Sequence, residues 1–323
     1  MANTNKQFLE FDSKTSITAS KVELMNEKRE KARTKIKDWF TEHHPDYPIS
    51  FWIQGSHKNS LNIRTKDDNC DQDDGIYVDR GPNESVDGTT LQEWILEAIK
   101  DITTEEAEHK DRCVRNYYKP YNMGSYHIDY PSYFKTEDMD HPMLTVKNSN
   151  LEESDPKEFS DWLVEQTDDK GQLRRLIRYM KAWCDHIDGD MLNGLTLSVL
   201  ACNNFVAKDG RDDEALYYTL LGIYRGLDNK WKCIMPATPN DDLLERYDYT
   251  FQSNFMNKLA ALINDAKKAL DEESKHEATR LWKKHMGKRY PLVTKEVTLG
   301  NRAALGSLVG NNKPYFDGSR RLS

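Results

Sequence analysis

Two short motifs in the first quarter of the chain contain residue types suited to phosphoryl transfer. Gly55-Ser56 directly follows the apolar run 50–54, and the acidic pair Asp71 and Asp73 comes a little later. A small turn that opens a helix offers backbone N–H groups to a triphosphate. Carboxylates at positions i and i+2 of a strand point to one face, where they can hold Mg²⁺ together. The two motifs therefore predict a metal-assisted nucleotide site.

A third carboxylate, Asp129, stands inside the apolar stretch Tyr126–Tyr130. Burying a lone carboxylate costs free energy, so packing alone is a poor reason for an aspartate there. Alone, a Gly-Ser pair indicates an ordinary turn and an acidic pair a solvated loop. In combination with Asp129 on a neighbouring strand, they predict the catalytic and metal-binding triad Asp71, Asp73 and Asp129 of a two-metal nucleotidyltransferase that uses Mg²⁺, with Mn²⁺ as an alternative.

Three stretches together resemble the signature of the bacterial CD-NTases, the cGAS- and DncV-like members of the polymerase-β-like superfamily. They are 54–56 (Gln-Gly-Ser), 71–77 (Asp-Gln-Asp-Asp-Gly-Ile-Tyr) and 126–129 (Tyr-His-Ile-Asp). The resemblance extends over about residues 50–245. It implies that Asp71 and Asp73 bind both metal ions, and that Asp129 completes one site and helps to deprotonate the acceptor ribose hydroxyl.

The same resemblance implies the nucleotide contacts. Gln54, Gly55 and Ser56 would seat the donor triphosphate, and Lys181, in the run 178–183, matches the family lysine that touches the donor phosphates. Relatives also place a serine at the start of the next helix, which is displaced or replaced here. Thr196 and Ser198 are the candidates, although either can simply face the core.

By this resemblance, the chain binds ATP and GTP and makes a cyclic dinucleotide, cyclic GMP-AMP or cyclic di-GMP, with release of pyrophosphate. The product would activate a separate effector protein in CBASS antiphage defence. Two alternatives stay open. One is a nucleotidyltransferase that acts on RNA or on a protein, and the other is a nucleotide-binding pseudoenzyme, against which the intact acidic residues argue.

The composition indicates which classes of partner the chain can bind. The chain has 323 residues, of which 37% are hydrophobic and 31% charged, and its net charge is −8. Tight binding to duplex nucleic acid requires a broad basic surface, so no nucleic-acid activator is expected. The five cysteines are scattered, and no apolar run is as long as a membrane span. We expect a cytoplasmic monomer that does not bind membranes.

The hydrophobic pattern predicts a bilobed α+β fold. A mixed sheet would carry the carboxylates (domain 1–150), and a C-terminal helical bundle would close the cleft (domain 151–323). A long N-terminal helix over 16–42 would brace both lobes. Strands are expected at 50–54, 70–79, 112–118, 125–134 and 143–147, and helices at 90–109, 157–167, 170–187, 193–207, 213–227, 251–271 and 273–286.

Four further features are interpreted as structural. Asp74 points away from the acidic pair and is expected to bond to backbone or to a nearby cation. His127 and His141 have no partner at metal spacing and are treated as ordinary residues. The glycine- and proline-rich tail after Pro291 is expected to form loops.

Overall fold

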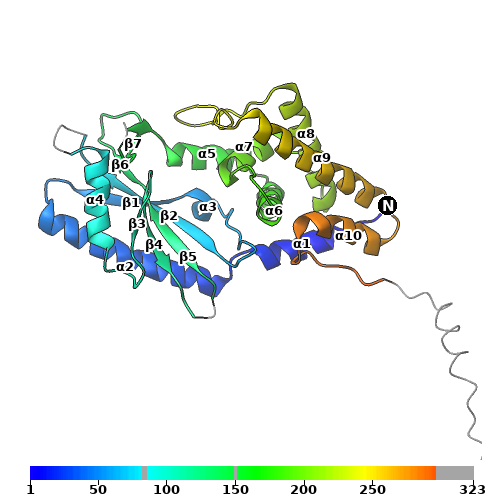
Figure 1. Ribbon diagram of the computed structural model, residues 1–323, viewed down its shortest axis with the longest axis horizontal. Coiled ribbons are helices and arrows are strands. Elements are labelled where there is room, and N and C mark those ends of the chain that lie inside the picture. Colours follow the sequence, from blue (N-terminus) through cyan, green and yellow to red (C-terminus); the bar gives the residue numbers. More distant parts are fainter. Residues whose placement is uncertain (82–85, 122, 149–150, 296–323) are drawn as a thin grey trace, which may run out of the picture.

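The computed structural model describes residues 1–81, 86–121, 123–148 and 151–295. Within these residues the chain forms two lobes, one built on a sheet and the other on helices, which lie side by side along the long axis (Figure 1). The predicted bilobed α+β fold with a mixed sheet and a C-terminal helical bundle is therefore confirmed.

The central strand of the sheet lobe is β2, which carries the acidic pair. β1 pairs with β2 antiparallel, whereas β5 and β6 run parallel to it. The remaining order extends from β5 through β4 to β3, and from β6 through β7 to β8. The strands are β1 (Ile49–Gln54), β2 (Cys70–Val78), β3 (Glu108–His109), β4 (Val114–Tyr118), β5 (Tyr126–Tyr130), β6 (Ser132–Phe134), β7 (Met143–Leu144) and β8 (Glu152–Glu153).

Three local predictions in this lobe need correction. The single strand expected over 125–134 is divided between β5 and β6 at Pro131, which has no N–H to donate to a ladder. The helix expected over 90–109 is α4 (Gly88–Ile99) and ends ten residues early, because Asp101, Thr103 and Thr104 favour local turns. The two-residue strands β3 and β8 were not predicted, since pairs this short carry no periodicity.

The N-terminal segment forms two helices rather than one. α1 (Asn5–Thr15) contributes Phe8 and Phe11 to the core of the helical lobe. α2 (Ala19–His43) contributes Met25 and Ile36 to the core of the sheet lobe. The side chain of Thr18 accepts a hydrogen bond at the start of α2 and so separates the two helices. The predicted brace is thus α2, which lies along the sheet, while α1 lies against the helical lobe (Figure 1).

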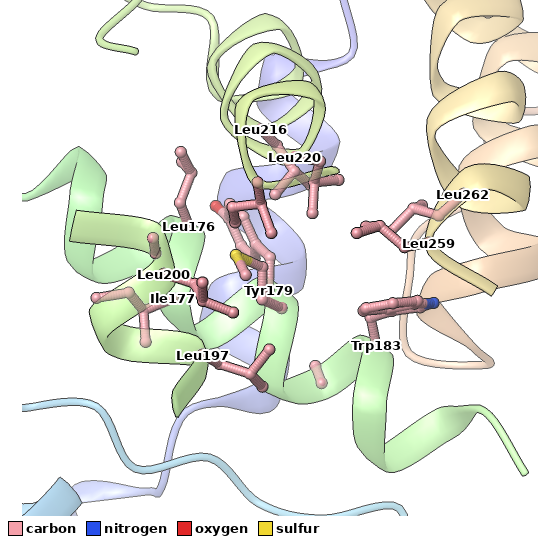
Figure 2. Packing of buried hydrophobic residues seen from close by; sticks show 14 of the residues in the cluster. Leu176, Ile177, Tyr179, Trp183, Leu197, Leu200, Leu216, Leu220, Leu259 and Leu262 are labelled. Atoms are coloured by element: carbon pink, nitrogen blue, oxygen red, sulfur yellow. The ribbon is translucent and has the colours of Figure 1, made fainter. Parts of the chain in front are cut away.

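The helical lobe packs around one apolar core. Figure 2 shows Tyr179 and Trp183 of α6 in this core, where they lie beside leucines from the neighbouring helices. The division of the chain at residue 150 stays a prediction, and the tail is described only as far as residue 295. The helices are α5 (Pro156–Gln166), α6 (Gln172–His186), α7 (Gly194–Asn204), α8 (Asp212–Asn229), α9 (Tyr249–Asp271) and α10 (Lys275–Met286).

Candidate active site

Strand β2 presents two carboxylates on one face. Asp71 and Asp73 are partly exposed, whereas the alternating residues Gln72 and Asp74 are fully buried on the opposite face. In the parallel pairing of β2 with β5, Asp73 stands opposite Asp129. Residues directly opposite on neighbouring strands point to the same face. The register therefore brings the three predicted metal-binding residues to one side of the sheet.

The buried neighbour Asp74 fixes β2 to the bracing helix. Arg33 of α2 donates two hydrogen bonds to its carboxylate, Nε to Oδ2 at 2.8 Å and Nη2 to Oδ1 at 2.5 Å. Burial raises the pKa of Asp74, and the bonds from Arg33 oppose this shift. This matches the expectation of a nearby cation. Because the paired Asp74 follows directly in the chain, the backbone of Asp73 is held in place.

The Gly-Ser turn packs directly against the acidic pair. Gly55 opens α3 (Gly55–Lys58), a single turn, with a φ of +65°. A β-carbon added at Gly55 would lie 2.1 Å from Oδ2 of Asp73, which is far inside van der Waals contact. Only glycine therefore allows both this backbone conformation and this approach of the carboxylate.

The side chain of Lys181 crosses from the helical lobe to this turn. Its Nζ donates to Oγ of Ser56 at 2.7 Å and to the carbonyl oxygen of Leu61 at 2.9 Å. Burial lowers the pKa of Lys181, and the nearby charges of Asp71 and Asp73 oppose the decrease. A cation between these acids and the turn is well placed for a triphosphate.

These groups line one cleft of about 460 Å³. Its walls are the Gly-Ser turn, the acidic pair, Lys181 and the start of α7. Gln54 is not part of this lining, since its amide donates to the hydroxyl of Tyr133 at 2.9 Å. Thr196 and Ser198 are buried. In their place Asn193, which caps α7, faces the cleft.

Two further residues near the carboxylates were not predicted. Asn62 donates from Nδ2 to the backbone oxygen of Asp71 at 2.7 Å. Arg115 of β4 stands opposite Asp129 in the antiparallel pairing of β4 with β5, and its guanidinium bonds to both carboxylate oxygens of Asp129. The sequence signal for Arg115 is only its place in an alternating strand, on the same face as Asp129.

The electrostatics of the carboxylates fit a divalent cation. Burial raises the pKa of Asp73 well above its usual value, and repulsion from Asp71 and Asp129 adds to the increase. A bound divalent cation would relieve that repulsion, and carboxylate oxygens are the ligands that Mg²⁺ prefers. The ligand atoms of these three residues, however, do not all lie within 4.8 Å of one another in the described chain.

The group that does meet this distance is elsewhere, at His141, whose interpretation as an ordinary residue stays a prediction. His141 lies near Asp155 and Glu158, and the three offer ligand atoms within 4.8 Å of one another. The partners are the N-cap residue and a first-turn residue of α5, too far from His141 in the sequence for a metal-ligand spacing to reveal them. Both acids also have structural roles, because Asp155 caps α5 and Glu158 accepts a hydrogen bond from the backbone N–H of Thr238.

The Lys181→Met variant should bind nucleotide more weakly. A hydrogen bond from a charged donor contributes about 1.5–3 kcal/mol, so loss of the ammonium should reduce affinity about tenfold to a hundredfold. Calorimetric titration with a nonhydrolysable triphosphate and Mg²⁺ measures this. Lys170→Met is the control, because Lys170 is exposed and pairs with the exposed Asp209. Equal affinity of the two variants would contradict a phosphate contact by Lys181.

Comparison with known proteins confirms the predicted resemblance. Residues 49–133 match the family model of the nucleotidyltransferase domain of cyclic GMP-AMP synthase DncV-like proteins. The cyclic GMP-AMP synthase of Escherichia albertii is 27% identical over 215 residues, which are 63% of this chain and 46% of that protein. The aligned part is thus less than half of the relative.

Solved structures show the same fold. The Vibrio cholerae DncV cyclic AMP-GMP synthase in complex with nonhydrolyzable GTP has a TM-score of 0.76 and 18% identity, with 91% of this chain and 100% of that chain covered. The same synthase with the linear intermediate 5′ pppA(3′,5′)pG has a TM-score of 0.72 and 18% identity, with 86% and 93% covered. No helix among the described residues is long and apolar enough to cross a membrane.

Proposed function

We propose that this chain is a metal-dependent nucleotidyltransferase that joins purine nucleoside triphosphates into a cyclic dinucleotide. The observation that carries the proposal is the meeting of a phosphate-binding turn and an acidic pair in one cleft. Gly55 packs against the carboxylate of Asp73, and Lys181 bonds to Ser56 from the opposite lobe. The family-model match, which covers the turn and all three acidic residues, supports the same chemistry.

Asp71, Asp73 and Asp129 would hold Mg²⁺, with Mn²⁺ as an alternative. When bound, the metal supplies Lewis-acid polarisation of the donor phosphate and lowers the pKa of the acceptor hydroxyl. The turn at Gly55 and Ser56 holds the donor triphosphate through backbone N–H groups and the serine hydroxyl. Lys181 balances the charge of the phosphates, so that the donor lies next to the acidic pair.

The reaction transfers a nucleotide in two rounds. The acceptor ribose hydroxyl gives its proton to the carboxylate of Asp129, and its oxygen attacks the donor α-phosphorus in line. The bond between the α-phosphorus and the oxygen that bridges the α- and β-phosphates breaks, and pyrophosphate leaves with that oxygen. Turning the linear product in the cleft allows a second transfer that closes the ring. The linear intermediate bound to the Vibrio synthase supports this order for a chain of the same fold.

We propose cyclic GMP-AMP or cyclic di-GMP as the product, made from ATP and GTP by a cytoplasmic monomer. The names of the relatives support purines. In CBASS antiphage defence the product would act on a separate effector protein. The net charge of −8 supports synthesis without a nucleic-acid activator.

Incubation of the full chain with all four triphosphates and Mg²⁺, followed by mass spectrometry, tests the function. We expect a purine cyclic dinucleotide and pyrophosphate without any added acceptor, and equal yield with or without duplex DNA or RNA over a range of salt. Transfer only to added RNA or protein would favour an acceptor-modifying nucleotidyltransferase. Nucleotide binding without any product would favour a pseudoenzyme, and a large salt-sensitive stimulation would indicate a nucleic-acid sensor.

A further inference from the structure

Asp129 has two possible partners in the sheet, one on each side. On β2 its register partner is Asp73, and on β4 its register partner is Arg115. Directly opposite residues on neighbouring strands have β-carbons about 4.5–5.5 Å apart and point to the same face. A small rotation of one side chain therefore decides whether the carboxylate of Asp129 turns toward the acidic pair or toward the guanidinium.

In this structure the guanidinium holds the carboxylate. Nε of Arg115 donates to Oδ1 of Asp129 at 2.6 Å, and Nη2 donates to Oδ2 at 2.7 Å. Both carboxylate oxygens are thus bonded by a planar fork, the geometry of the strongest ion pairs. The oxygens of Asp71, Asp73 and Asp129 correspondingly do not all lie within 4.8 Å of one another. The backbone is in register for a three-carboxylate site, but the third side chain is held by Arg115.

We propose that Arg115 is a latch on the metal site. Its guanidinium compensates the charge of Asp129, and it must release that carboxylate before Asp71, Asp73 and Asp129 can bind a metal ion together. This proposal rests on the proposed function, because it presupposes a metal at Asp71 and Asp73. Arg115 is a positioning residue in this role, since it acts through Asp129.

The surroundings of Arg115 allow the released state. Its side chain is 21% exposed, and its guanidinium carbon lies 5.9 Å from the ring centroid of Tyr117. After release, the guanidinium can therefore stay on the aromatic face and be solvated, so no buried cation is left without a partner. Besides the acidic pair, two other titratable groups lie close to Asp129. They are the thiol of Cys113, whose pKa is raised chiefly by burial and further by the Asp129 carboxylate, and His127, whose Nε2 lies 4.0 Å from Oδ1. That distance is too long for His127 to replace the fork.

Removal of the latch should tighten metal binding in the absence of nucleotide. The probe is Mn²⁺, titrated into the full-length protein while the free ion is followed by electron paramagnetic resonance. Arg115→Met loses the fork and the charge, and should bind Mn²⁺ about tenfold more tightly. Arg115→Lys keeps the charge but loses the fork, and should still bind more tightly than the parent protein. The control is Arg112→Met, which removes an exposed charge that pairs with Glu152 and should leave affinity unchanged.

Each outcome decides the proposal. Weaker binding in both Arg115 variants would overturn it and make Arg115 a support that orients Asp129 as a ligand. Tightening in Arg115→Met with none in Arg115→Lys would also overturn it, because the effect would then be one of net charge alone. Mn²⁺ binding that persists with unchanged affinity in a variant with Asp71→Asn, Asp73→Asn and His141→Ala, which also disrupts the group of His141, Asp155 and Glu158, would overturn the metal site itself, and the proposed function with it.

A second measurement needs no variant. In the parent protein, the Nε–H proton of Arg115 is bonded to Asp129, and its NMR signal should exchange slowly with water. Added Mg²⁺ should increase that exchange rate, with the same midpoint as Mg²⁺ binding measured by its displacement of Mn²⁺ in the paramagnetic resonance titration. An exchange rate that stays constant as the site fills would show that the ion pair survives metal binding and that no latch operates.

Discussion

The Asp71→Asn, Asp73→Asn double variant is expected to make no detectable cyclic dinucleotide, while its fold is retained. Loss of one preorganised charge-stabilising group commonly costs on the order of a hundredfold to a thousandfold in rate, so loss of two shared metal ligands should cost at least about a thousandfold. Asparagine keeps the shape of the side chain and removes charges that repel each other, as the raised pKa of Asp73 indicates. Mass spectrometry of product and circular dichroism of the variant check both parts.

The matched control for this variant is Asp79→Asn. Asp79 follows directly after β2 and is exposed, so the substitution removes a nearby charge without touching the cleft. Its rate of synthesis should equal that of the parent protein. A double variant that still made product at near the parent rate would remove the metal from the mechanism. A variant that no longer folded would instead give these aspartates a structural role.

The core of the candidate site could be predicted because it depends on local geometry. The two-residue period of a strand fixes that Asp71 and Asp73 share a face and that Asp74 does not. The short apolar run before Gly55 is enough to place the turn at the end of a strand. Asp129 could be assigned because a carboxylate within an apolar stretch requires a partner. The structure places all three carboxylates on one side of the sheet, where the pairing of β2 with β5 sets Asp73 opposite Asp129.

The parts that could not be predicted depend on which strands and helices become neighbours. Arg115 belongs to the site only because β4 pairs with β5 in the register that sets it opposite Asp129. His141 gained acidic neighbours only because α5 packs beside its loop. The position of Asn193 at the cleft follows from how α7 meets α6. No periodicity within one segment contains this information. Of the residues that reach the site from the helical lobe, Lys181 was identified in advance, and it was identified by the family resemblance rather than by physical reasoning.

The Gly55→Ala variant is expected to lose both metal and nucleotide binding. An added β-carbon would lie 2.1 Å from Oδ2 of Asp73, so either the turn or the carboxylate must move. A displacement of about 1 Å at a catalytic group can cost on the order of a hundredfold in reaction rate. Here the displacement would move the phosphate-binding turn and a metal ligand together, so the affinities for nucleotide and for metal should both fall. Titration of Mn²⁺, and of a nonhydrolysable triphosphate, should each show that loss.

Gly210→Ala separates the collision from the strain of the backbone. Gly210 has a φ of +62°, close to the +65° of Gly55, but an added β-carbon there meets nothing within 4 Å. Backbone strain should cost both variants about 1 kcal/mol of unfolding free energy, because alanine disfavours this conformation, and the collision with Asp73 should cost Gly55→Ala more. Only Gly55→Ala should also lose binding, since only there does the β-carbon reach Asp73. If the two variants bound metal and nucleotide equally well, contact between the turn and the carboxylate would have no part in forming the site, and Gly55 would serve the turn alone.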